Sequence, residues 1–203
     1  MGARTAAWLA AWAAILGLLH ATAGLAADNP GQKRKSPEKK WQTLDNCRYV
    51  AREANDGDSF GLQCASRKFV LRLYFVDAPE PNLRYGERVR EQAQHFGTSL
   101  DETLNAGYRA RDLVRNLLGG AFIVLTKRAS APGRSSEPRF YGLVQVSGQF
   151  LHEVLLAEGL ARVKGVTTAL PNGTPSHDYV KRLQTLEDQA RVQRKGVWAR
   201  SSR

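Results

Sequence analysis

Two short acidic motifs, with one arginine between them, hold the side chains of this sequence that are best suited to bind a metal ion and an anion. The motifs are Asp56-Gly57-Asp58 and Asp77-Ala78-Pro79-Glu80. Arg72 lies in the run 69–76, which is otherwise almost entirely apolar. Carboxylates and free backbone carbonyls are the ligands that calcium prefers, and a buried guanidinium requires carboxylate or phosphate oxygens. The combination indicates metal-assisted chemistry on a phosphodiester.

Each of these features has a simpler interpretation when it is taken alone. Asn and Asp-Gly pairs between two β-type runs are typical of a tight hairpin. An arginine in a strand can extend to solvent or pair with a neighbouring acid. Pro79 ends the apolar run, so Asp77 and Glu80 are presented at the end of a strand, where backbone carbonyls are free.

Together, the two motifs resemble the paired signature of the staphylococcal nuclease (thermonuclease) family. The matching stretches are Asp56-Gly57-Asp58-Ser59 and Arg72-Leu73-Tyr74-Phe75-Val76-Asp77-Ala78-Pro79-Glu80. Weaker similarity follows in the segments 140–146 and 151–161 and in Lys195-Gly196-Val197-Trp198, so the resemblance covers roughly 47–199. Two linked motifs are more specific than either motif alone.

The resemblance implies a role for each polar residue. Asp58 and Asp77 correspond to carboxylate ligands of a calcium ion, and the backbone carbonyl of Ala78 corresponds to a third ligand. Glu80 corresponds to the residue that orients or deprotonates the attacking water, and Arg72 to the arginine that binds the scissile phosphate. These roles also make chemical sense, because a cation and a rigid guanidinium stabilise the negative charge of a phosphorane-like transition state.

The sequence departs from the family pattern at the second catalytic arginine. The family places it directly after a Tyr-Gly pair, whereas Leu143 follows Tyr141-Gly142 here. Arg139 is our assignment, since it is two residues before Tyr141 and points to the same face of an extended strand. Arg134 is the reserve. The alternative is that Arg139 belongs to the Ser-, Pro- and Gly-rich loop 129–138.

Aromatic residues for contact with a nucleotide base are also missing where the family commonly has them. The segment 164–175 contains no aromatic residue. Tyr141 or Tyr85 are the candidates to replace them, and reliance on phosphate contacts with weak base preference would follow.

Charge favours a polyanionic partner. The chain has 30 Lys and Arg against 19 Asp and Glu, a formal net charge of +11. DNA and RNA are therefore the expected partners, although anionic membrane surfaces or acidic polysaccharides would attract the same charge. The sequence contains no Walker loop, serine nucleophile elbow or dinucleotide-binding glycine pattern, which removes the common hydrolase and nucleotide-cofactor alternatives.

Three segments are expected along the chain. Residues 1–26 have the pattern of a cleavable signal peptide, which predicts an exported, secreted or periplasmic protein with no stable membrane span after processing, an uncleaved anchor being the alternative. Residues 27–44 are a basic flexible linker, and 45–200 are one staphylococcal-nuclease-like OB-fold domain. Cys47 and Cys64 flank the Asp56 turn, so they form either a disulfide across the hairpin or two buried thiols.

The expected fold class is α+β, a five-stranded OB-type Greek-key β-barrel with about three packed helices. The predicted strands are 47–54, 58–65, 69–76, 121–126 and 140–147. The predicted helical segments are 87–96, 100–118, 150–158 and 176–194.

We therefore predict a calcium-dependent, sugar-nonspecific nuclease that hydrolyses DNA and RNA and acts as a monomer. Cleavage of the 5′-O–P bond to leave 3′-phosphates is implied by the resemblance only. One alternative is an OB-fold nucleic-acid-binding module whose activity has lapsed, and another is a basic protein that docks to acidic cell-surface polymers. Neither alternative explains why Asp58, Arg72, Asp77 and Glu80 are all present.

Overall fold

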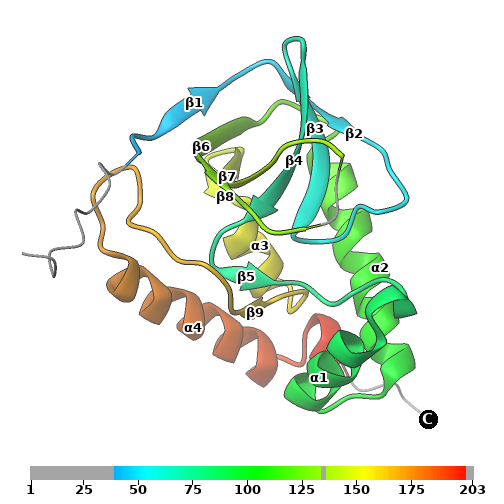
Figure 1. The fold of residues 1–203 in the computed structure, drawn as a ribbon. Helices are drawn as coiled ribbons and strands as arrows, with labels where there is room; N and C mark the ends of the chain where they lie inside the picture. The colour runs from blue at the N-terminus through cyan, green and yellow to red at the C-terminus, as the bar shows by residue number, and fades with distance from the viewer. Residues whose placement is uncertain (1–38, 134–135, 200–203) are drawn as a thin grey trace, which may run out of the picture. The chain divides into compact units, whose positions relative to one another are not determined.

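A curled mixed β-sheet forms the centre of the α+β fold in the computed structural model, which describes residues 39–133 and 136–199 (Figure 1). The strands are β1 Gln42–Leu44, β2 Cys47–Val50, β3 Ser59–Cys64, β4 Arg67–Leu73, β5 Val76–Asp77, β6 Ile123–Ser130, β7 Arg139–Val146, β8 Gln149–Phe150 and β9 Arg162–Val163. The strand order of the seven-stranded sheet is β1-β6-β7-β4-β3-β2, with β8 paired to β7, and β5 pairs separately with β9. Strands β4 and β7 are parallel. Apolar side chains of β3 and β4, such as Phe60, Leu71 and Leu73, are completely or almost completely buried and fill the core.

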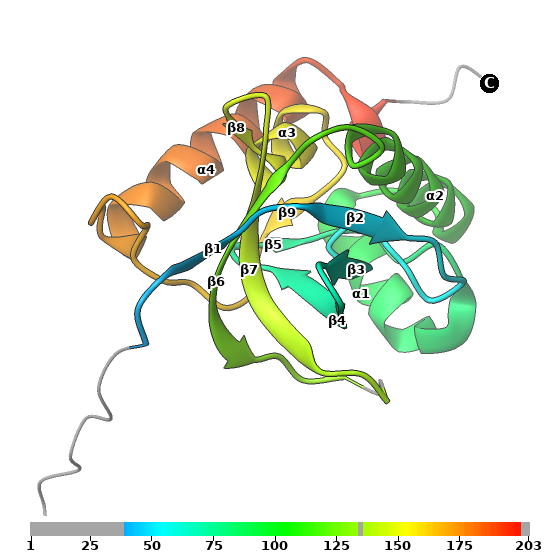
Figure 2. The same ribbon diagram turned by 90° about the horizontal axis from the view of Figure 1, so that it is seen from above.

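The sheet has seven strands and does not close, and this corrects the predicted five-stranded OB-type barrel. The first strand divides into β1, which pairs with β6, and β2, which pairs with β3. Asn46, with a φ of 51°, turns the chain between them. The two edges of the sheet are therefore consecutive parts of one segment, as the view in Figure 2 shows. Residues 42–44 belong to the folded sheet and not to the predicted linker 27–44.

The predicted third strand, 69–76, is divided as well. β4 ends at Leu73, and Phe75 adopts a φ of 73° that turns the chain out of the large sheet. Val76 and Asp77 then pair antiparallel with β9, which places Asp77 opposite Arg162. This change of sheet brings a residue 85 positions downstream against the second acidic motif.

Four α-helices lie in the described part of the chain, one in each of the four predicted helical segments, whereas the predicted fold class had about three packed helices. They are α1 Gly86–Phe96, α2 Leu100–Leu117, α3 Leu151–Ala157 and α4 Ser176–Val192, with short 3-10 turns η1 Leu83–Tyr85 and η2 Gly196–Trp198. Helix α1 packs on α2 at one end of the sheet, and α3 packs on α4 (Figure 1). Ser99 and Glu102 form a reciprocal capping box that fixes the start of α2.

A face of small residues on α2 lets both acidic motifs approach the helix. A Cβ atom added to Gly107 would lie 2.4 Å from the backbone oxygen of Glu80. A Cβ atom added to Gly57 would lie 2.7 Å from Cβ of Ala110 and 2.8 Å from Cβ of Ala78. Helix α2 therefore supports the backbone of both motifs through contacts that leave no room for another carbon atom.

A disulfide joins Cys47 and Cys64, which are opposite each other in the β2–β3 register. The disulfide interpretation is therefore confirmed over two free thiols. The predicted signal peptide and the linker up to residue 38 lie outside the described residues. Within residues 39–133 and 136–199, no helix is long and apolar enough to cross a membrane.

The close contact of α2 with Glu80 gives a stability test. Gly107→Ala should lower the free energy of unfolding by about 1–3 kcal/mol, because the methyl group forces the helix and the Glu80 backbone apart. Helix propensity alone would raise stability by about 1 kcal/mol, so the sign of the change is informative. Gly120→Ala is the control, since a Cβ atom there would have no neighbour within 4 Å. Urea denaturation of both variants measures the effect, and equal stabilities would contradict this packing.

Candidate active site

The Asp56 side chain shapes the first acidic loop. Its Oδ1 accepts hydrogen bonds from the backbone nitrogens of Asp58, at 2.9 Å, and Ser59, at 2.5 Å. The backbone nitrogen of Leu73 donates to the carbonyl oxygen of Asp58, at 2.8 Å. The loop is thereby fastened to the end of β4, where Arg72 lies.

Asp58 connects the two acidic motifs. Its Oδ2 accepts a hydrogen bond of 2.7 Å from the backbone nitrogen of Ala78. Its Oδ1 is 2.6 Å from Arg72 Nη1, and a second nitrogen of Arg72 is 3.3 Å from Asp77 Oδ1. The Arg72–Asp58 contact is an ion pair without hydrogen-bond geometry, so Asp58 Oδ1 is buried with no hydrogen-bond partner. Arg72 is therefore charge-paired with both aspartates.

Asp77 is surrounded by donors that sequence analysis did not identify. Arg162 approaches Asp77 Oδ2 with Nε at 2.8 Å and Nη2 at 2.7 Å, and Arg88 Nη2 donates to Oδ1. The Arg162 side chain is only 3% exposed, and its Nη1 also donates to Glu91 at 2.7 Å. With Arg72, Asp77 thus contacts three arginines, of which Arg162 is the most buried.

Gln92, which is completely buried on α1, fixes the second motif through three hydrogen bonds. Its Nε2 donates to the carbonyl oxygen of Ala78 at 2.8 Å and to Asp77 Oδ2 at 3.2 Å. Its Oε1 accepts from the backbone nitrogen of Glu80 at 3.0 Å. Gln92 is a positioning residue for the motif.

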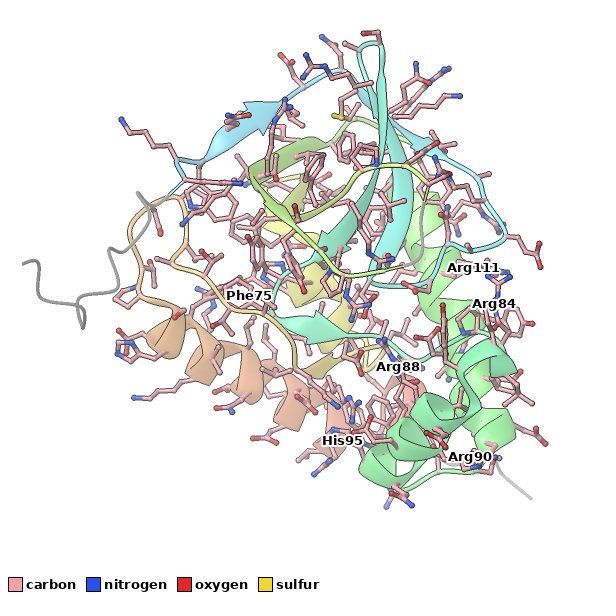
Figure 3. The ribbon with its side chains drawn as sticks, viewed as in Figure 1. Phe75, Arg84, Arg88, Arg90, His95 and Arg111 are labelled. Atoms are coloured by element: carbon pink, nitrogen blue, oxygen red, sulfur yellow. A yellow bond between two sulfur atoms is a disulfide. The ribbon has the colours of Figure 1, made fainter. Side chains whose placement is uncertain are left out.

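Arg88 bridges two carboxylates of the second motif. Its Nε is 3.0 Å from Glu80 Oε1, in addition to its contact with Asp77. Its side chain is 35% exposed, against 8% for Glu80. In Figure 3, Arg88 lies where α1 approaches β5. Arg88 is the most exposed of the three arginines that pair with these acids.

Arg139 lines the same cleft as the two acidic motifs. The parallel register places Val70 opposite Arg139 and Arg72 opposite Tyr141, so the two arginines share a face of the sheet. Arg139 makes no ion pair with a carboxylate in the described part of the chain, and its buried Nε has no hydrogen-bond partner. Arg134, the reserve assignment, lies outside the described residues.

The cleft has a volume of about 800 Å³ and opens between the first loop, the segment from Glu80 to α1, and the start of β7. Its charged lining consists of four arginines and the acids Asp56, Glu80 and Glu87. Its lining includes Asn55, Asp56, Arg72, Glu80, Arg84, Tyr85, Arg88, Gly133 and Arg139. An anion that enters this cleft reaches guanidinium groups and carboxylates together.

The carboxylates differ in how their surroundings shift ionisation. Burial raises the pKa of Asp58 well above its usual range, against the opposing effect of Arg72. Burial also raises the pKa of Glu80, with Arg88 opposing it. Asp77 is the opposite case, because Arg88 and Arg162 overcome its burial and lower its pKa. The surroundings therefore disfavour the charged form of Asp58 and favour the charged form of Asp77.

The pKa values of Arg139 and Arg72 are shifted in opposite directions. Burial lowers the pKa of Arg139, and the neighbouring charge of Arg72 lowers it further. For Arg72, the attraction of Asp58 and other carboxylates exceeds the effect of burial and raises the pKa. A bound anion would compensate the charge of Arg139, which the protein leaves without a paired carboxylate among the described residues.

The donor set fits a hard cation in its chemistry. Asp58, Asp77 and the Ala78 carbonyl supply only oxygen, and Asp58 Oδ1 is a buried oxygen without a hydrogen-bond partner. In the described ranges, no cluster of three or more His, Cys, Asp or Glu side chains has the arrangement of a metal site. The oxygens of Asp77 already contact arginines, so calcium would have to compete with Arg88 for them.

Two sequence signals would have identified the missed residues. Gln92 interrupts the apolar face that Val89, Ala93 and Phe96 form on α1, and a buried amide there needs polar partners. Arg162 lies between the apolar residues Ala161 and Val163. It is therefore a charged residue in an apolar stretch, as Arg72 is in its own strand. Their shared partner, Asp77, depends on the β5–β9 pairing, which no local pattern predicts.

Comparison with known protein families assigns the chain to a class. The family model described as staphylococcal nuclease homologue matches residues 70–200, well over half of the sequence. The chain therefore belongs to the staphylococcal nuclease homologue family. The match includes Arg72, Asp77 and Glu80 and begins after the Asp56 turn. A search of curated protein sequences found no match.

The opposite pKa shifts of Asp58 and Asp77 predict opposite effects on stability in the presence of chelator. Asp58→Asn should raise the free energy of unfolding at neutral pH, because it removes a buried charge whose folded-state pKa is raised. Asp77→Asn should lower it by about 3–5 kcal/mol, because Arg162 loses its buried partner.

The pH dependence follows from the same shifts. A raised folded-state pKa means that the native chain gains stability relative to Asp58→Asn as pH falls through that pKa. The stability from the lowered pKa of Asp77 is present above its unfolded-state value and is lost as pH falls through the folded-state pKa. Urea denaturation at several pH values measures both, and changes of the same sign at neutral pH would refute this electrostatic assignment.

Proposed function

We propose that the chain is a calcium-dependent, sugar-nonspecific nuclease that hydrolyses phosphodiester bonds of DNA and RNA. The observation that carries this proposal is that Arg72, Glu80 and Arg139 line one cleft. Behind this lining, Arg72 is paired with the carboxylates of Asp58 and Asp77. Membership of the staphylococcal nuclease homologue family supports nuclease chemistry. The positive net charge of +11 supports a polyanionic substrate.

In the proposed reaction, Glu80 accepts a proton from the attacking water as the new P–O bond forms. The bond to the 5′ oxygen breaks, this oxygen takes a proton from solvent, and the phosphate remains on the 3′ side. A base with a raised pKa suits this step, because proton transfer is most effective when the pKa approaches the working pH.

Arg72 and Arg139 would bind the non-bridging phosphate oxygens from one face of the sheet. Arg72 stays in place through Asp58 and Asp77, while Arg139 has its charge available for the substrate. Calcium held by Asp58, Asp77 and the Ala78 carbonyl would add positive charge beside the phosphate.

A nucleic-acid-binding module with lapsed activity is the second candidate. The residue after Tyr141-Gly142 is Leu143, so an arginine is missing from the place where the family pattern has one. If Arg139 does not compensate, the cleft would bind a phosphodiester without cutting it efficiently.

We also propose that the protein is exported and works outside the cytoplasm. Residues 1–26 would be the signal peptide, and residues 27–41 would be a linker to the nuclease domain, which begins with β1. The Cys47–Cys64 disulfide supports this location, since disulfides persist in oxidising compartments. We propose a monomer as the functional unit.

Cleavage assays test the function directly. The chain should cut single-stranded DNA and RNA in calcium and should lose activity in chelator. Glu80→Gln should lower kcat by about 10²–10⁴-fold, since it removes the proton acceptor and keeps the side-chain shape. Gln63→Ala, outside the cleft, is the control. Tight binding of substrate by the unmutated chain with no cleavage in calcium would exclude the nuclease and favour the binding module.

A second assay tests the arginine assignment. Arg139→Gln should lower kcat/KM by about 10²–10³-fold, because it removes positive charge from the transition state. Arg139→Lys should recover only part of this loss, since an ammonium lacks the two-pronged geometry of guanidinium. Arg90→Gln is the matched control, because Arg90 lies on α1 and does not line the cleft (Figure 3). Equal activities of Arg139→Gln and Arg90→Gln would show that Arg139 has no role in the reaction.

A further inference from the structure

Tyr85 places an exposed aromatic ring at the cleft. It ends the 3-10 turn η1, directly before α1, and 45% of its surface is exposed. Among the described residues that line the cleft, Tyr85 is the single aromatic side chain. Tyrosine is enriched at binding interfaces, because its ring offers an apolar face and its hydroxyl stays in water.

The other tyrosine candidate, Tyr141, already has one face of its ring stacked on another tyrosine. Its ring stacks on Tyr74 with 5.0 Å between centroids, and the residue is half-buried. Tyr108 is exposed to a similar extent, at 43%, but it lies on α2, contacts Arg111 and does not line the cleft. Tyr85 therefore combines exposure with a position in the cleft that Arg72 and Glu80 also line.

The backbone that carries Tyr85 is well supported. Asn82 Oδ1 accepts a hydrogen bond of 3.0 Å from the backbone nitrogen of Arg84 and caps η1. Buried Pro81 precedes this turn, and α1, held by Gln92, follows it. A ring on such a support needs little additional ordering when it stacks on a ligand.

Arg84 and Arg88 flank Tyr85 in the sequence and line the same cleft. In Figure 3 both arginines lie near the start of α1. A polyanion whose phosphates contact these guanidinium groups would carry its bases past the Tyr85 ring. Alternating basic and aromatic groups are the pattern by which proteins bind single-stranded nucleic acid.

We propose that Tyr85 is a base-stacking subsite that receives an unpaired nucleobase next to the phosphate bound by Arg72 and Arg139. This inference rests on the proposed function, because it places the base relative to the phosphate that Arg72 and Arg139 would bind. Stacking uses the face that every base has, so the subsite selects single strands over duplexes without selecting a base.

Binding in chelator tests the subsite without cleavage. The probes are a fluorescently labelled single-stranded oligonucleotide and an abasic oligonucleotide of the same length, which keeps the phosphates and lacks the bases. Tyr85→Ala should weaken binding of the first probe about 5- to 100-fold and leave binding of the abasic probe unchanged. Tyr85→Phe should bind both probes like the native chain, since the stacking ring remains.

Tyr108→Ala is the matched control, as it removes an equally exposed tyrosine outside the cleft. It should bind both probes normally. Equal loss of affinity for both probes in Tyr85→Ala, or no loss for either, would overturn the subsite, as would absence of oligonucleotide binding by the native chain. If binding depends on the bases and on Tyr85 but the chain does not cleave in calcium, the subsite is supported and only the proposed nuclease activity is rejected.

Discussion

The buried ion pair between Asp77 and Arg162 is the interaction on which the rest of the site depends. The side chains of Arg162 and Asp77 are 3% and 6% exposed. If one of the two were removed, water could not solvate the charge that remains. Loss of one partner from such a pair costs about 3–5 kcal/mol, whereas the intact pair contributes little net stability. The pair therefore specifies where Asp77 points more than it stabilises the fold.

This constraint explains the division of the third strand. Were β4 to continue through Asp77 in the large sheet, the carboxylate would not lie opposite Arg162. The turn at Phe75 moves Val76 and Asp77 onto β9, and the backbone of Phe75 makes two further hydrogen bonds, with Val166 and Lys164. Local backbone geometry and the buried charge thus favour the same arrangement.

The sequence predicts the local parts of the site and misses those that depend on distant pairing. Asp58 and Glu80 lie in the two acidic motifs, and Arg72 lies between them in the sequence. Arg72 and Glu80 are found at the cleft, and Asp58 is paired with Arg72. Arg162 and Gln92 escaped prediction, since their contacts with Asp77 join segments 85 and 15 residues apart. The prediction of a five-stranded barrel is wrong for a similar reason. The first strand divides at Asn46 into β1 and β2, and the residue pattern of neither part indicates this division.

The arginines in and behind the cleft differ in how far carboxylates of the protein already neutralise their charge. Arg162 and Arg72 are committed to carboxylates that hold them in fixed positions. Arg88 is also paired but is 35% exposed, so its contact with Asp77 is the one that an arriving cation can most readily replace. Arg139 is partly buried beside another arginine, with its pKa lowered. A bound phosphate would relieve this repulsion. Its negative charge is best placed at Arg139, because Asp56 and Asp58 attract this guanidinium too weakly to offset its burial and the charge of Arg72.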